Sequence, residues 1–239
     1  MSNPTNTNSN WNTIYKLGAW AAIGAVLVGV VEILITFLPG GNSTQETVLD
    51  WFLLFQENPF MGLRNLGLLN IMLNLLAIFT YLALYGAHRK TAYKPLAALA
   101  AIISYLGIGV FFATNRAFAM LGLSQQYAAV ASDVQQTIME AAGQALLSVG
   151  ESHSPGTFLA FFLAESAGVL ISYVMLRANI FSKAAAYAGM LGFSILLLFE
   201  FLPSFFSGLS QAAMLLAMIG GLFSMVWHIL IARQLFQMK

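Results

Sequence analysis

The sequence contains no cysteine and few charged residues. Of its 239 residues, 59% are hydrophobic and 8% are charged, whereas soluble domains carry about 25% charged side chains. The absence of cysteine excludes disulfides, thiolate catalysis and the usual cysteine-ligated zinc and iron–sulfur sites. The formal net charge of +1 gives no concentrated basic face of the kind that nucleic-acid binding requires. The composition therefore points away from a soluble globule and away from a nucleic-acid partner.

The hydrophobic residues are gathered into long stretches. A membrane-spanning helix needs about 20 largely apolar residues, because each residue rises about 1.5 Å through a hydrocarbon core about 30 Å thick. Six stretches meet this length: 17–38, 60–85, 96–116, 156–176, 184–202 and 211–231. The first is too long for a signal-peptide core and lacks a small-x-small cleavage site after it. We therefore predict an all-α, polytopic membrane protein with a single six-helix transmembrane domain over residues 14–239.

The loop charges predict the orientation. One set of alternate loops and ends is basic: Lys16, Arg89, Lys90, Lys94, Arg177, Lys183, Arg233 and Lys239. The other set is acidic: Glu46, Asp50, Glu57, Asp133, Glu140 and Glu151. Because cytoplasmic loops carry an excess of lysine and arginine, we predict cytoplasmic termini in a cell (inner or plasma) membrane. Residues 1–13 are rich in Ser, Asn and Thr and are predicted to form a flexible tail.

Two segments on the predicted outer side also have helical patterns. Ser43-x-x-Glu46 can form a capping box ahead of apolar residues, and Pro59 ends that segment. The second pattern runs from about Ser124 to Leu147. Segments 44–57 and 124–147 are predicted to be either interfacial helices resting on lipid headgroups or lids over a cavity.

A polar cluster remains when the loop charges are set aside. Its ionisable members lie in or at the ends of five hydrophobic stretches: Glu32, Arg64, Arg116, Glu165 and Glu200. Amides accompany them at Asn65, Asn70, Asn74 and Asn115, and Asn70 and Asn74 share a helix face because they are four residues apart. A charge that faced lipid at the bilayer centre would cost about 2.5–3.5 kcal/mol. We therefore expect these groups to turn inward in the outer half of the bundle.

The cluster has two interpretations, a structural salt-bridge network or a polar pocket. For the pocket, the ligand-binding candidates are Glu32, Arg64, Asn70, Asn74, Asn115, Arg116, Glu165 and Glu200. Glu165 is the most deeply placed acid and lies in an otherwise apolar stretch. Burial would favour its neutral form, whereas an arginine neighbour would favour its ionised form.

The other candidate groups give no catalytic or metal site. His228 is predicted near the cytoplasmic end, far from the cluster, as a packed or interfacial histidine in the stripe of Gly220 and Ser224. His88 and His153 lie on opposite sides of the predicted membrane, so the three histidines cannot form one metal site. No nucleophile elbow, P-loop or dinucleotide motif is present. We predict no catalytic residue, no metal and no cofactor.

Several short segments carry a resemblance to a known family. They are Asn58-Pro59 and Gly62–Asn70, Leu123–Ala128, Ala142–Leu146, Val174–Arg177 with Phe181-Ser182, and Ala232–Phe236. The chain resembles an uncharacterised bacterial multi-pass membrane family, the domain of unknown function 4386 family. The resemblance implies a multi-pass prokaryotic protein and implies no reaction.

Three functions stay open from the sequence. The first is binding or transport of a small polar or zwitterionic ligand in an outward-facing charged pocket. The second is an intramembrane enzyme acting on a lipid or lipid-linked substrate, with Glu165 as general base and Arg116 as anion clamp. The third is a non-catalytic assembly or signalling subunit. The expected partners are the lipid bilayer and a small polar ligand or lipid.

Overall fold

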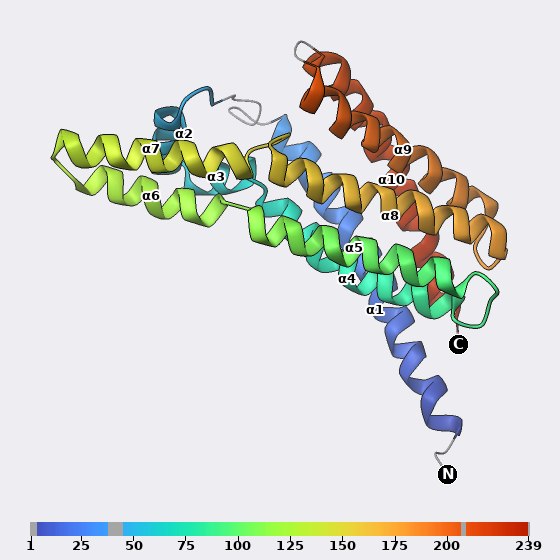
Figure 1. Ribbon diagram of the computed structural model, residues 1–239. Helices are drawn as coiled ribbons and strands as arrows, with labels where there is room; N and C mark the ends of the chain where they lie inside the picture. The colour runs from blue at the N-terminus through green and yellow to red at the C-terminus, as the bar shows by residue number, and fades with distance from the viewer. Residues whose placement is uncertain (1–3, 38–44, 207–208, 239) are drawn as a thin grey trace.

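The chain folds entirely into helices in the part that the structure describes. The computed structural model describes residues 4–37, 45–206 and 209–238, and within these ranges it contains ten helices and no strand. Figure 1 shows a bundle of long helices with its two termini at the same end. We refer to this end as the terminal end and to the other as the distal end. The prediction of an all-α protein is confirmed.

Six helical spans are long and apolar enough to cross a membrane in the described residues. The helices that form them are α1 (Pro4–Thr36), α4 (Leu68–His88), α5 (Lys94–Thr114), α8 (Pro155–Ala178), α9 (Lys183–Phe205) and α10 (Ser210–Gln237). Their outer faces expose large apolar side chains such as Trp20, Leu34 and Met214, each more than 60% accessible. Water would disfavour such a surface, whereas lipid would cover it. The protein is a multi-pass membrane protein.

The spanning helices form a closed ring. Each contacts two neighbours in the order α1, α4, α5, α8, α9, α10 and back to α1. Small residues allow the close approaches. At Gly107 in α5, for example, an added Cβ would lie 3.0 Å from the Ala160 carbonyl oxygen of α8. Because lipid gives helices little hydrophobic reason to associate, such close packing is a main source of their attraction.

The terminal end of the ring is tightly packed. Its core includes Leu84, Ile171, Met175, Ile231 and Leu235 in a single cluster of buried residues. The side chains at the start of α1 join this end by specific contacts. The Tyr15 hydroxyl donates to the Gly86 carbonyl oxygen over 3.0 Å, and the Arg89 guanidinium lies 4.4 Å from the Trp11 ring centre. Helix α1 begins at Pro4, inside the segment 1–13 that the sequence predicted to be a flexible tail, and Trp11 at the end of that segment is in contact with Arg89. Residues 1–3 lie outside the described ranges.

Two of the predicted spans are interrupted near the distal end. The stretch 60–85 is divided into α3 (Pro59–Asn65) and α4, and Gly67 between them has a φ of +95°, a left-handed conformation that suits glycine. The stretch 96–116 ends at Thr114, and a new helix, α6 (Ala117–Ala129), begins after Arg116. One contact joins the two breaks, because the Asn115 side-chain amide donates to the Leu66 carbonyl oxygen over 2.8 Å.

Four helices project from the distal end. They are α2 (Val48–Glu57), α3, α6 and α7 (Asp133–Gly150), and Figure 1 shows α6 and α7 as a pair that extends α5 and α8 beyond the ring. Buried residues of α2, α6 and α7 pack together, including Phe52, Phe55, Met120 and Leu147. The predicted single helix 124–147 is wrong, because Val130 and Ser132 have extended backbones and divide it into α6 and α7.

The cap of α2 also differs from the prediction. Thr47 is the N-cap, and its hydroxyl accepts from the Asp50 backbone N–H while the Asp50 carboxylate accepts from the Thr47 backbone N–H. This is a capping box four residues later than the predicted Ser43-x-x-Glu46 pair. Ser43 lies outside the described residues. Asn58 then ends α2 and caps α3, with Pro59 in its first turn, so the predicted end of the segment at Pro59 is confirmed.

Candidate functional site

A cavity of about 550 Å³ occupies the centre of the ring. All six spanning helices contribute to its wall, for example through Gly29 of α1, Asn74 of α4, Ile108 of α5, Leu196 of α9 and Ala217 of α10. None of the described residues of α2, α3, α6 or α7 belongs to the wall. The projecting helices therefore contribute nothing to the wall itself, and the lid interpretation gains no support from it.

The cavity runs from the distal surface of the bundle to beyond the middle of α10. Ser152, in the loop between α7 and α8, is exposed and lines the cavity at that end. In the other direction the wall follows α10 from Ala217 to His228, a distance of about 17 Å at about 1.5 Å per residue. Beyond His228 and Trp227 the terminal-end core closes the bundle. The site is thus a deep pocket with a closed floor.

Three carboxylates line the cavity: Glu32, Glu165 and Glu200. Glu165 projects from α8, about 15 Å along that helix from its start at about 1.5 Å per residue, and its Oε2 is buried without a hydrogen-bond partner. No lysine or arginine is among the cavity-lining residues that the structure describes. Glu165 is consequently the acid whose charge has no basic partner in the described chain.

Glu200 is paired with a histidine at the distal end. His153 Nδ1 lies 3.4 Å from Glu200 Oε2, and the Glu200 side chain is 8% exposed. His153 belongs to the loop before α8, where its φ of +60° turns the chain, and its ring packs edge-on against Phe199 at 5.0 Å. His153 Nδ1 and Glu200 Oε2 are both buried without a hydrogen-bond partner in the described residues, so His153 is a basic neighbour of Glu200 rather than a hydrogen-bonded one, and Glu165 has no such neighbour in the ion pairs described.

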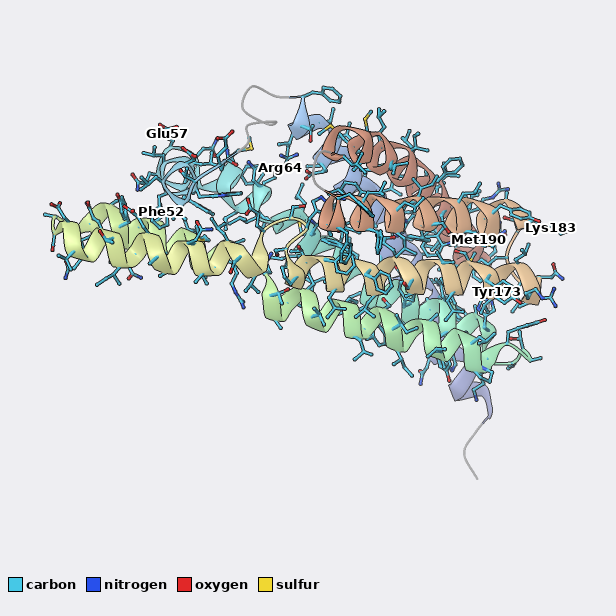
Figure 2. All side chains as sticks on the ribbon, turned by 45° about the horizontal axis from the view of Figure 1, so that its top comes forward. Phe52, Glu57, Arg64, Tyr173, Lys183 and Met190 are labelled. Carbon is cyan, nitrogen blue, oxygen red and sulfur yellow. The ribbon has the colours of Figure 1, made fainter. Side chains whose placement is uncertain are left out.

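Glu32 is paired with Arg64. The Arg64 guanidinium lies 2.5 Å from Glu32 Oε1 and donates to the Thr36 hydroxyl over 2.6 Å and to the Asn65 side-chain oxygen over 3.0 Å. The Arg64 side chain is 8% exposed and that of Glu32 is 45% exposed. Figure 2 shows Arg64 where the projecting helices meet the ring, on the distal side with Phe52 and Glu57 and far from Lys183. The pair joins α3 to α1 at the edge of the cavity.

Two of the three candidate amides line the cavity, whereas the third and Arg116 bind backbone groups outside it. Asn70 and Asn74 line the cavity, and the Asn74 amide donates to the Asn70 carbonyl oxygen over 2.8 Å. Asn115 and Arg116 do not line it. The Asn115 side-chain oxygen accepts from the Ala117 N–H, and Arg116 donates to the Ala113 carbonyl oxygen over 2.8 Å. Both side chains thus bind backbone groups where α5 gives way to α6.

The floor of the cavity contains polar groups that the sequence assigned to packing. His228 lines the same cavity as Glu165, so its predicted separation from the cluster is wrong. Its Nδ1 lies 2.8 Å from the Ser224 carbonyl oxygen, which fixes the hydrogen on Nδ1. The Ser224 hydroxyl lies 3.5 Å from the same nitrogen, and Tyr81 lines the same cavity. The four-residue spacing of Gly220, Ser224 and His228 places them on one face of the helix. Whether that face meets another helix or the cavity depends on the order of the helices around the ring.

Aromatic rings supply much of the remaining wall. Tyr81, Phe161, Phe193, Phe199 and Trp227 come from α4, α8, α9 and α10. The faces of such rings carry partial negative charge and attract cations. The cavity therefore combines an unpaired carboxylate with aromatic surfaces, and its volume lies within the range of about 300–1,000 Å³ typical of small-molecule sites.

Comparison with known proteins returns no relative. No family model, no curated protein and no solved structure matches the chain. The fold and the cavity define a class of protein: a multi-pass membrane protein in which six helices enclose an acidic cavity lined by aromatic residues. The resemblance of the short segments to the domain of unknown function 4386 family stays a prediction.

Proposed function

We propose that this protein binds a small polar ligand carrying a positively charged group, such as an ammonium, in the central cavity and carries it across the membrane. The observation that supports the proposal is Glu165, a carboxylate in the cavity with no basic partner in the described chain. A buried charge needs a counter-charge. A cationic ligand supplies it, and the aromatic rings that line the cavity would attract the same cation by cation–π interaction.

The distribution of positive charge favours a cation over a zwitterion. The carboxylate of a zwitterionic ligand would need a cationic partner in the wall, and both arginines of the predicted cluster are engaged elsewhere. Arg64 binds Glu32, and Arg116 binds backbone oxygens away from the cavity. The same placement of Arg116 removes the anion clamp from the lipid-enzyme hypothesis. The assembly-subunit hypothesis gains no comparable observation, because Glu165 takes part in no described ion pair.

The charged loops suggest the direction from which the ligand enters. Arg89, Lys90 and Lys183 lie at the terminal end of the bundle and Glu46 and Glu57 at the distal end. The positive-inside tendency then makes the terminal end cytoplasmic, so the cavity faces outward. We place the protein in the plasma membrane of a bacterium on the same grounds and on the resemblance of its short segments.

Binding to the full chain in detergent tests the proposal. The ligands are quaternary ammonium ions of increasing size, tetramethylammonium, choline and benzyltrimethylammonium, with 3,3-dimethylbutan-1-ol as the neutral isostere of choline. An ion pair at about 5 Å and an effective dielectric constant of about 20 is worth about 3 kcal/mol, or roughly a hundredfold in Kd. We therefore expect Glu165→Gln to weaken cation binding by about that factor and leave the neutral isostere unaffected.

A matched variant separates the site from general charge effects. Glu57→Gln removes one negative charge from the exposed end of α2, outside the cavity, and should leave Kd unchanged. Uptake of labelled choline into reconstituted vesicles then distinguishes transport from binding alone. The proposal is refuted if none of the ammonium ions binds, or if Glu165→Gln and Glu57→Gln bind them equally well.

A further inference from the structure

In the cavity without a bound cation, an ionised Glu165 would have no opposite charge beside it among the described residues. Glu165 is the exception among the three cavity acids, since Glu32 has Arg64 at 2.5 Å and Glu200 has His153 at 3.4 Å. Its Oε2 is buried and accepts no hydrogen bond. An uncompensated ionised carboxylate in such surroundings is strongly disfavoured. When no cation is bound, the Glu165 carboxyl group therefore avoids an uncompensated charge by carrying a proton.

The groups that face Glu165 do not compensate a negative charge on its carboxyl group. From α9 it meets Glu200, whose charge repels its own, and from α4 it meets the Tyr81 hydroxyl. His228 of α10 and Glu32 of α1 lie in the same cavity, the latter with Arg64 of α3. His153 of the α7–α8 loop lies 3.4 Å from Glu200. The residues of α5 in the wall, Ser104, Ile108 and Phe111, carry no charge.

We propose that the proton is the second ligand of this cavity, and that Glu165 exchanges one proton for one bound cation. This inference rests on the proposed function and adds the ion that is exchanged. As the cation enters, the O–H bond of the Glu165 carboxyl group breaks, the carboxylate pairs with the cation, and the proton passes to water at the distal end beside Ser152. The two ligands compete for one carboxylate and cannot occupy it together.

Calorimetry of benzyltrimethylammonium binding to the full chain in detergent measures the exchange. A quaternary ammonium has no ionisable proton, so any proton released comes from the protein. Titration at one pH in buffers of different ionisation enthalpy gives the number released per cation. In the pH range where Glu165 is protonated, the number of protons released should approach one. In that range Kd should fall about tenfold for each unit by which the pH rises, because one proton competes with one cation. Above that range both effects should disappear.

Three variants of the cavity acids assign the exchange to a residue. Glu165→Asp keeps a carboxylate and should retain a pH-dependent Kd, whereas Glu165→Gln should lose the dependence. Glu200→Gln should retain it, since Glu165 is intact. Loss of the pH dependence in Glu200→Gln with its retention in Glu165→Gln would overturn the assignment to Glu165.

The outcomes separate this inference from the proposed function. Binding of benzyltrimethylammonium with a pH-independent Kd and no proton release overturns the exchange but leaves cation binding in place. No binding by the wild-type chain at any pH overturns both. Proton release together with a Kd that depends on pH in the wild type and in Glu165→Asp supports both.

Discussion

The close approach at Gly189 offers a direct test of how the cavity floor is built. Gly189 lies in the second turn of α9, and a Cβ added there would overlap Ser172 Oγ of α8 and the edge of the Trp227 ring of α10, with Trp227 Nε1 at 2.6 Å. Ser172 and Trp227 are both buried, and Trp227 lines the cavity. Replacement of Gly189 by alanine must therefore displace helices or side chains at the junction of three helices.

The magnitude follows from two opposing contributions. Overpacking a tight core costs about 1–3 kcal/mol, and the upper part of that range, about 2–3 kcal/mol, applies here because three heavy atoms lie within 2.6 Å of the added Cβ. The better helix propensity of alanine returns about 1 kcal/mol. Gly189→Ala should therefore lower the free energy of unfolding by about 1–2 kcal/mol. At about 2–4 °C per kcal/mol for a chain of this size, the Tm in detergent should fall by about 2–8 °C.

A second glycine supplies the control. Gly109 lies in α5 on an exposed face, and an added Cβ would meet nothing within 4 Å. Gly109→Ala should keep the propensity gain of up to about 1 kcal/mol without the clash, so its Tm should equal or exceed that of the wild type. Thermal unfolding followed by intrinsic fluorescence in one detergent compares the three proteins. Equal Tm values for Gly189→Ala and Gly109→Ala would refute the packing described for α8, α9 and α10.

The edge of the cavity and the projecting helices allow two further predictions. Arg64→Ala and Glu32→Ala, combined in a double-mutant cycle in detergent, should give a coupling of about 1–2 kcal/mol, between the values for exposed and buried pairs because Glu32 is half-exposed; additive effects would show that the pair contributes nothing. Hydrogen bonds from the Thr47 hydroxyl and backbone hold the pKa of the Asp50 carboxyl group below its ordinary value. A lowered pKa stabilises α2 at pH values above the ordinary pKa of about 3.9, and the contribution is lost as pH falls through the lowered value. The protection factors of the α2 amides, which are corrected for the pH dependence of intrinsic exchange, should thus fall in acid for the wild type but not for Asp50→Asn. The same fall in both proteins would contradict the capping box.

The sequence alone determined the properties that depend on composition along the chain. Six helices long and apolar enough to span a membrane follow from local hydropathy, and the structure has six such spans in the residues that it describes. The sequence also identified the unusual acids at membrane depth, because a charge in an apolar stretch is visible without knowledge of its neighbours. Five of the eight candidates, Glu32, Asn70, Asn74, Glu165 and Glu200, line one cavity.

Only the tertiary structure decided which of these groups meet. The sequence gives no information on the order of helices in the ring, and that order turns His228 of α10 toward the cavity that contains Glu165. The helix breaks at Gly67 and Asn115 likewise depend on a contact across 49 residues, from the Asn115 amide to the Leu66 carbonyl oxygen. That Glu165 has no basic partner among the described residues is a property of this arrangement, since charge compensation depends on distance in space and not on separation along the chain.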